Sequence, residues 1–312
     1  MAVSKYDIQL DLDKSPDTSH AYMVDLVGSN KRVLDVGCAT GYLAKALAAF
    51  GNAVCGVEYD ADAAEQARPH LETLLVGDLE NVDLVEGFGE GSFDVVVFGD
   101  VLEHLRDPLA VLRQARPLLK PGGSVVISVP NVAHGDVRLA LLRGRFEYRN
   151  LGLLDETHVR FFTRESLGTF LADGGFVPVD IRRTTAPLFS TEIGVRREDF
   201  DPQLVEQIEA DPEATTYQFV VRAVRDDATR VDVEVVQRAE EQCVRIGQLE
   251  QQAQKLTEQR DAAIARAESL GVEVERQRQR VAELEDELLR IRHSGVMRAT
   301  RIPRAAWRKL NS

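Results

Sequence analysis

Three acidic residues and one glycine turn have the types and spacing to bind a nucleoside. Asp35, Glu58 and Asp78 each lie at the end of a short apolar run, and the turn GCATG (residues 37–41) follows the first run. Small residues let a ligand come close to the backbone, and a carboxylate at a strand end can accept both hydroxyl groups of a ribose. Asp78 could accept a hydrogen bond from an adenine amino group.

The spacing of the turn excludes two common nucleotide sites. A dinucleotide fold needs G-x-G-x-x-G, whereas this turn reads Gly37-x-Ala39-x-Gly41 and lacks the Lys-Ser/Thr pair of a P-loop. The shorter loop leaves no room to seat a pyrophosphate on the next helix N-terminus. The expected ligand is a nucleoside whose third part is neither a diphosphate nor a triphosphate.

The elements around these residues predict an α/β fold. Five apolar runs alternate with helical patterns between about residues 32 and 129, namely RVLDVG, NAVCGVE, TLLVGDL, FDVVVFGD and GSVVISVPN. Val-rich strands that alternate with helices indicate a parallel sheet covered on both faces. Thr163 is the expected N-cap of a later helix, followed by the strand-like runs FVPVDIRRT and TYQFVVRAV with the helical stretch DPQLVEQIEA between them.

Five of these stretches also resemble a known family. VLDVGCATGYL, GVEYD, GDLE, FDVVVFGDVLEHLRDPLAVL and LLKPGGSVVISVPN, in this order, are similar to the motifs of class I S-adenosylmethionine-dependent methyltransferases, and the match covers about Asp17 to Arg225. The resemblance implies a Rossmann-like seven-stranded sheet with helices on both faces, its last strand antiparallel, and S-adenosyl-L-methionine as cofactor.

The same resemblance assigns the cofactor contacts. It places Asp35 and the turn at the methionine portion, Glu58 at the ribose, and Asp78 with Leu79 at the adenine. The full set of expected contacts is Asp35, Gly37, Cys38, Gly41, Tyr42, Glu58, Tyr59, Asp78, Leu79, Gly99 and Asp100. Ala39 departs from the family, which most often has Gly there, and we expect cofactor binding to survive this added methyl group.

A histidine is the expected base if the methyl acceptor is a hydroxyl group. His158 is the first candidate, with Asp155 as the carboxylate that orients it, and His134 is the second. The alternative for each is a structural role, such as capping a helix. His104 is interpreted as structural or close to the cofactor, and His20 lies outside the expected mouth. No metal ligands are expected.

The acceptor is less constrained than the cofactor. Residues 131–163 resemble the corresponding segment of bacterial methyltransferases found with glycosyltransferases in surface-polysaccharide gene sets, which implies a sugar or glycan acceptor. The basic, partly aromatic residues there could form a lid over a phosphorylated sugar, or a salt-bridged helix surface: Arg138, Arg143, Arg145, Tyr148 and Arg149. A small molecule, such as a quinone or secondary metabolite, is the alternative acceptor.

Composition limits the location and the partners. The net charge is −13, which disfavours a broad nucleic-acid-binding face, and three cysteines without C-x-x-C spacing disfavour a disulfide framework or zinc site. Neither a signal peptide nor a transmembrane run is visible, so we expect a cytoplasmic protein. Residues 290–312 carry seven Lys or Arg and no acid, which suits peripheral contact with the inner face of the membrane.

A heptad pattern divides the chain into three expected parts. From Ile246 to Ile291, twelve of fourteen a and d positions are apolar, which predicts a coiled coil. The expected parts are a methyltransferase domain at 1–225, a coiled coil at 226–292 and a basic amphipathic tail at 293–312. A homo-oligomer or a partner protein would use the coiled coil. The alternatives are a single helix folded back on the first domain, and a scaffold that recruits a membrane-associated glycan-synthesis complex.

Overall fold

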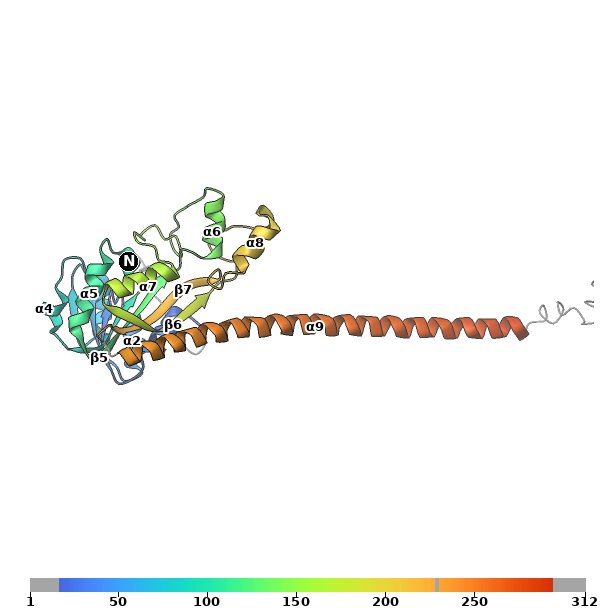
Figure 1. Ribbon diagram of the computed structural model, residues 1–312, viewed down its shortest axis with the longest axis horizontal. Helices are drawn as coiled ribbons and strands as arrows, with labels where there is room; N and C mark the ends of the chain where they lie inside the picture. The colour runs from blue at the N-terminus through green and yellow to red at the C-terminus, as the bar shows by residue number, and fades with distance from the viewer. Residues whose placement is uncertain (1–16, 228–229, 294–312) are drawn as a thin grey trace, which may run out of the picture. The chain divides into compact units, whose positions relative to one another are not determined.

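The computed structural model describes residues 17–227 and 230–293 (Figure 1). Its contacts divide the chain into two units, Met1–Val244 and Arg245–Ser312. The strands are β1 Arg32–Val36, β2 Ala53–Glu58, β3 Thr73–Val76, β4 Phe93–Gly99, β5 Leu119–Pro130, β6 Phe176–Thr185 and β7 Thr216–Arg225. The helices are α1 Ser19–Val27, α2 Tyr42–Ala48, α3 Ala61–Ala67, α4 Leu84–Phe88, α5 Pro108–Leu118, α6 Gly135–Leu142, α7 Arg164–Asp173, α8 Pro202–Glu209 and α9 Arg230–His293, with short 3-10 turns η1 Arg68–His70, η2 Leu102–His104 and η3 Arg197–Asp199.

The seven strands form one sheet in the order β3-β2-β1-β4-β5-β7-β6. The pairs from β3 to β5 are parallel, and β7 is antiparallel to both β5 and β6. The predicted sheet and its antiparallel last strand are therefore confirmed. The strand order reverses between β1 and β4, and ligands of open α/β sheets bind at the carboxyl ends of the strands beside such a reversal.

Two apolar clusters cover the two faces of the sheet. Val33 of β1 packs with α1 and α2, whereas Leu34 and Val36 pack with residues of α5 and α7. This alternation follows from the two-residue period of a strand. Because both faces are buried, the position of each strand end is fixed by the packing on both sides.

A third apolar cluster lies outside the two sheet layers. It includes Val137 of α6, Leu153, Ile193 and Ile208 of α8, and Figure 1 shows α6 and α8 together, apart from the strands. We call residues 131–162 and 186–215 the cap. The first segment follows β5, and the second runs from the end of β6 to the start of β7. Since β6 runs parallel to β5, both segments leave the sheet at its carboxyl edge.

The long helix α9 contains the predicted heptad segment. Its 64 residues run from Arg230 to His293. The coiled coil itself and the domain limits at 225 and 292 stay predictions. The basic tail predicted for 293–312 lies outside the described residues, apart from His293. Within the described part of the chain, no helix is long and apolar enough to span a bilayer.

Helix α7 begins as the sequence predicts, at Thr163. The Thr163 hydroxyl accepts from the Ser166 backbone N–H at 3.2 Å, and the Ser166 hydroxyl accepts from the Thr163 N–H at 2.8 Å. This reciprocal capping box satisfies two N–H groups that the helix itself cannot pair.

Thr163→Ala should lower the free energy of unfolding by about 1 kcal/mol, because it removes the cap. Urea unfolding of the full chain measures this effect. Thr169→Ala in the same helix is the control, since the exposed Thr169 hydroxyl only bonds back to the Glu165 carbonyl. Equal losses for both variants would contradict the capping role.

Candidate active site

The acids predicted to bind the nucleoside lie at neighbouring strand ends. Asp35 of β1 is in register with Gly56 of β2, and Glu58 ends β2 two residues later. Asp100 directly follows β4, the other neighbour of β1. These strands are parallel, so their carboxyl ends form a single edge at the reversal of strand order. The topology thus brings three of the predicted residues together.

The turn after β1 is held in an open, left-handed conformation. Gly37 has φ of +77° and Gly41 of +79°. A Cβ on Gly41 would come 2.8 Å from Cα of Ala67, so the close approach of α3 requires glycine there. The Ala39 N–H donates to Oε2 of Glu58 at 2.8 Å, which ties the turn to the end of β2.

Ala39 also has a positive φ, of 45°. The left-handed region costs an L-residue roughly 1–2 kcal/mol, and glycine avoids this cost. The departure from the family motif is therefore a strained position rather than a blocked one.

Ala39→Gly should raise the free energy of unfolding by about 0.5–1 kcal/mol. Relief of the strained φ outweighs the extra entropy that glycine gives the unfolded chain. Thermal unfolding compares it with Ala61→Gly at the exposed start of α3, which should destabilise the protein by up to about 1 kcal/mol. Destabilisation by both substitutions would show that Ala39 is unstrained.

Asp35 is a buried acid with an unsatisfied oxygen. Its exposed fraction is 2%, and its Oδ2 has no hydrogen-bond partner among the described residues. Burial raises the pKa of Asp35 to about 7, and the nearby Glu58 carboxylate adds to this rise. A positively charged ligand would relieve both effects. The residue therefore fits the cationic methionine portion of S-adenosylmethionine.

Asp35→Asn should stabilise the ligand-free protein increasingly as the pH rises. The folded state keeps the Asp35 proton up to about pH 7, whereas the unfolded chain releases it near pH 4, so wild-type stability falls over this window. The advantage of the variant should grow by about 3 kcal/mol between pH 5 and pH 8. Chemical denaturation at both pH values measures it. A difference that does not change with pH would rule out the raised pKa.

Glu58 and Asp78 both hold their own strand ends in addition to facing this edge. Oε1 of Glu58 accepts from the Tyr59 and Asp60 N–H groups, each at 2.9 Å. Oδ1 of Asp78 accepts from the Glu80 N–H at 3.0 Å. A carboxylate oxygen has two lone pairs, so Glu58 Oε2, which among the described residues accepts only from the Ala39 N–H, and Asp78 Oδ1 each keep one for a ligand hydroxyl or amino group.

The other predicted cofactor contacts differ in exposure. Leu79 and Cys38 are buried, and burial together with Asp35 and Glu58 raises the pKa of the Cys38 thiol. Tyr59 is 75% exposed. Tyr42 packs edge-on against the ring of His20, with ring centroids 5.2 Å apart.

Asp100, at the carboxyl edge of the sheet, connects the end of β4 to β5 and β7. Its φ is +55°, and its Oδ1 accepts from the Ser128 hydroxyl and from Nε2 of Gln218, both at 2.5 Å. Gly99 precedes it, where a Cβ would come 3.3 Å from Met23 of α1. The end of β4 is thus fixed against three neighbouring elements.

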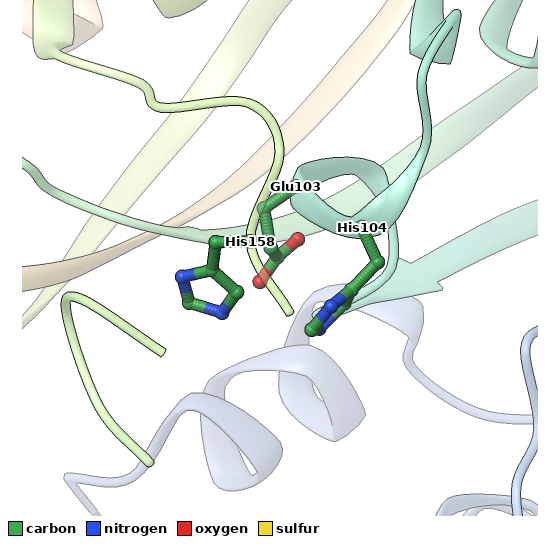
Figure 2. A group of neighbouring side chains, drawn as sticks. All are labelled: Glu103, His104 and His158. Carbon is green, nitrogen blue, oxygen red and sulfur yellow. The ribbon is translucent and has the colours of Figure 1, made fainter. Parts of the chain in front are cut away.

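Glu103 and His104 follow β4 in η2, and His158 of the cap joins them in a cluster at this edge. Figure 2 shows the Glu103 carboxylate between the two imidazole rings. One donor atom from each residue lies within 4.8 Å of the others, and the ring centroids are 4.8 Å apart. The Glu103 carbonyl accepts from the Val159 N–H at 2.9 Å and the Arg160 N–H at 3.0 Å, which brings the cap to this turn.

Burial governs the protonation of this cluster. Glu103 is 1% exposed, and burial, followed by the charge of Asp100, raises its pKa well above the usual range. Burial, with the adjacent His104, lowers the pKa of His158, while Asp155 opposes this shift. Glu103 Oε2 and His158 Nδ1 have no hydrogen-bond partner among the described residues. The cluster can therefore exchange protons, and its carboxylate and imidazoles are also donors that a divalent cation accepts.

The His104 ring has a defined orientation. Its Nδ1 lies 3.2 Å from the Thr157 carbonyl oxygen, which only accepts, so Nδ1 must carry the proton. In the neutral ring Nε2 then holds the lone pair. His104 is half-buried, whereas His158 is buried. His104 is thus the more accessible proton acceptor of the two.

The structure does not support His134 as the base. Its side chain has no exposed surface, its Nδ1 accepts from the Asp136 N–H at 3.1 Å, and its Nε2 lies 3.0 Å from the Ala186 carbonyl oxygen. Both ring nitrogens are therefore occupied by the backbone. His134 caps α6 and joins the two cap segments.

Asp155 does not orient His158 through Nδ1, because that nitrogen has no partner. The Asp155 carboxylate accepts instead from the Thr157 N–H at 2.9 Å and the Thr157 hydroxyl at 2.6 Å. These bonds shape the loop that carries His158. Asp155 therefore acts on the cluster through its charge and through the loop backbone.

Sequence reasoning missed two residues near this edge. Glu103 was passed over although it directly precedes His104, and consecutive acid and imidazole groups after a strand were the available signal. His20 was placed outside the site, but it contacts Tyr42, and the charge of Asp100 acts to raise its pKa against the stronger lowering by burial. Only the packing of α1 over the strand ends shows that His20 lies near this edge.

The expected basic lid is largely neutralised by ion pairs. Each of its four arginines lies 2.8–3.2 Å from a carboxylate oxygen: Arg138 from Asp211, Arg143 from Asp199, and Arg145 and Arg149 from Glu147. The salt-bridged alternative is therefore what the structure contains. Exposed apolar side chains accompany these pairs, namely Leu141, Leu142, Phe146, Tyr148, Leu151 and Val159.

A known family matches the first unit of this chain, and known proteins match part of the chain. A family described as "Methyltransferase domain" matches residues 11–181. A Psychrobacter arcticus protein named "Ubiquinone biosynthesis O-methyltransferase" is 30% identical over 167 residues, 52% of this chain and 65% of that protein. A Xanthomonas campestris protein of the same name is 37% identical over 123 residues, 38% of this chain and 52% of that protein. The chain thus spans between half and two thirds of the length of these two relatives.

Solved structures also resemble this chain. One is a "SAM dependent methyltransferase" from Archaeoglobus fulgidus, with 17% identity and a TM-score of 0.48, covering 68% of this chain and 96% of that one. Another is "1,6-didemethyltoxoflavin-N1-methyltransferase" from Burkholderia thailandensis, with 19% identity and a TM-score of 0.44, covering 69% of this chain and 81% of that one.

Proposed function

This chain belongs to the methyltransferase-domain family, whose methyl donor is S-adenosylmethionine, and from this premise we propose that it methylates a hydroxyl group of a small, largely apolar acceptor. The observation that carries the proposal is the cluster of Glu103, His104 and His158 beside the cofactor edge. A hydroxyl acceptor must lose a proton, and the cluster supplies a group that can take it.

The residues at the strand ends fit the cofactor. S-adenosylmethionine supplies a methyl carbon on a positively charged sulfur, so the electrophile needs little further activation. Asp35 would face the positive charges of the methionine portion, and Glu58 would accept from the ribose. Asp78 and the buried Leu79 would hold the adenine. What remains for the protein is to orient the acceptor and to remove its proton.

His104 is the proposed proton acceptor. The Thr157 carbonyl holds the Nδ1 proton, which leaves Nε2 to take the proton of the acceptor hydroxyl. The imidazolium that forms is stabilised by the Glu103 carboxyl group, which ionises more readily beside a positive charge. His158 packs edge-on against His104 and limits the movement of its ring.

The cap favours an apolar, aromatic acceptor. Aromatic rings lead from the cluster to the surface, from His158 to Phe161, from Phe161 to Phe146 and from Phe146 to Tyr148, with centroids 5.5–6.4 Å apart. A phenolic hydroxyl has a pKa near 10, so an imidazole can help to deprotonate it more easily than a sugar hydroxyl. The relatives named for ubiquinone biosynthesis agree with such an acceptor.

The glycan acceptor expected from the sequence has less support. It came from the resemblance of residues 131–163 to glycan-associated methyltransferases, and the four arginines that could bind a phosphorylated sugar there are ion-paired. A screen with methyl-labelled cofactor separates the two acceptor classes, using alkylated catechols and nucleotide sugars as probes. We expect label in the catechols. Transfer to sugars alone would overturn the apolar acceptor, and failure of the full chain to bind S-adenosylmethionine would overturn the enzyme and favour the scaffold.

His104→Ala should lower kcat by about 100-fold to 10,000-fold while the Kd of S-adenosylmethionine changes little, because general bases contribute rate enhancements of this order. Glu103→Gln should give a smaller loss, since the Glu103 carboxyl group stabilises the imidazolium but does not itself take the proton. Steady-state kinetics and calorimetry on the same preparations measure the two effects.

His70→Ala is the matched control, because His70 lies in η1 just before β3, at the opposite edge of the sheet. It should leave kcat and Kd unchanged. An unaltered kcat in His104→Ala would remove His104 as the base. Activity lost on chelator treatment and restored by a divalent cation would assign the cluster to a metal instead of a proton.

A further inference from the structure

The C-terminal part of α9 exposes a narrow apolar stripe. The stripe repeats at alternating steps of three and four residues between 267 and 291. Its large members are 44–66% exposed: Leu270, Val274, Val281, Leu284, Leu288 and Ile291. A stripe that repeats every 3.5 residues is the width of a contact with one other helix.

The residue types between Leu270 and Leu284 favour two strands. Only the last heptad, with Leu288 at a and Ile291 at d, has the order that favours more strands. Val274 and Val281 occupy a positions, and Leu270 and Leu284 occupy d positions. In parallel coiled coils, β-branched residues at a with leucine at d favour dimers over trimers. Gln277 at a d position would face its own copy, where paired amides fix the register.

The charges beside the stripe fit a parallel second copy of the same helix. In a parallel, in-register pair, each g position faces the e position five residues later on the other helix. Glu273 then faces Arg278, and Arg280 faces Glu285, so both contacts join opposite charges and each occurs twice.

The antiparallel alternative fails the same test. In an antiparallel pair the g positions lie beside g positions, so full overlap of residues 267–291 brings Arg280 beside its own copy and Glu273 beside Glu287. Like charges then meet at both positions. Orientation is therefore encoded by these charges, and the apolar stripe alone would not specify it.

Ion pairs within one helix are too weak to prevent ion pairs between two helices. Arg280 lies 2.9 Å from Glu283, and Arg276 lies 3.5 Å from Glu273, both at exposed i,i+3 spacing. Exposed pairs of this kind are weak, so the side chains can exchange partners when a second helix arrives.

We infer that residues 267–291 of α9 form a parallel, in-register, two-stranded coiled coil with a second copy of this chain. The occupant is a second copy because the charge pattern is complementary to itself. The inference is independent of the acceptor and of the proposed base, since it uses no residue of the methyltransferase site.

Charge reversal in two matched variants tests the pairing in the full chain. Variant one is Glu273→Arg with Arg280→Glu, and variant two is Arg278→Glu with Glu285→Arg. Each alone places like charges together and should raise the dimer dissociation constant about 10-fold to 100-fold. An equimolar mixture restores every opposite pair and should form heterodimers. Sedimentation velocity and the unchanged melting temperature of the methyltransferase unit provide the readout and the folding control.

A cysteine pair tests the orientation. Leu270→Cys in a Cys243→Ser background should form a disulfide between two chains under mild oxidation, because residue 270 meets its own copy only in the parallel arrangement. Val272→Cys is the control, since Val272 is 72% exposed and lies off the stripe. A monomer or trimer by sedimentation, no dimerisation in the mixture, or a dimer without the residue-270 cross-link would overturn the inference.

Discussion

The burial of two carboxyl groups at one edge of the sheet is the constraint on which the active site depends. Asp35 and Glu103 are almost fully inaccessible, each keeps an oxygen without a partner among the described residues, and burial raises both pKa values. An apolar interior would not retain such groups for stability alone. The packing on both faces of the sheet must hold these carboxyl groups in place. A cationic ligand then recovers, as binding free energy, part of the stability that their burial costs.

The geometry of this edge follows from the order of the strands. Because β1 lies between β2 and β4, the acids that follow these three strands come from distant parts of the sequence to adjacent positions. The two segments of the cap also leave the sheet at this edge. Backbone N–H groups of Val159 and Arg160 bind the Glu103 carbonyl, so the residue that anchors the cap also carries the buried carboxyl group. In the proposed reaction, acceptor binding and proton removal are thereby linked through one turn.

Patterns of neighbouring residues were sufficient to predict the sheet. Side-chain contacts between segments far apart in the sequence could not be predicted. The N-cap of α7 at Thr163 depends on neighbouring residues and is as expected, whereas the hydrogen bond from the Ala39 N–H to Glu58 was not foreseen. The pairing of His104 with His158 joins residues 54 positions apart, through a loop whose path no periodicity reveals. The partner of His134 at Ala186 was not predictable for the same reason, because it lies across the cap. The ion pairs of Arg138 with Asp211 and of Arg143 with Asp199 likewise join the two cap segments.

The cap has an apolar core of its own, separate from the two that cover the sheet. Asp136 closes it by accepting from the Phe189 N–H at 2.7 Å and the Thr191 hydroxyl at 2.6 Å, so its two segments are joined to each other as well as to the strands. Substitutions within this core can therefore reshape the surface of the cap without moving Asp35, Glu58 or the turn. In the proposed reaction, acceptor preference can then change through the two cap segments, while the residues that face the cofactor keep their geometry.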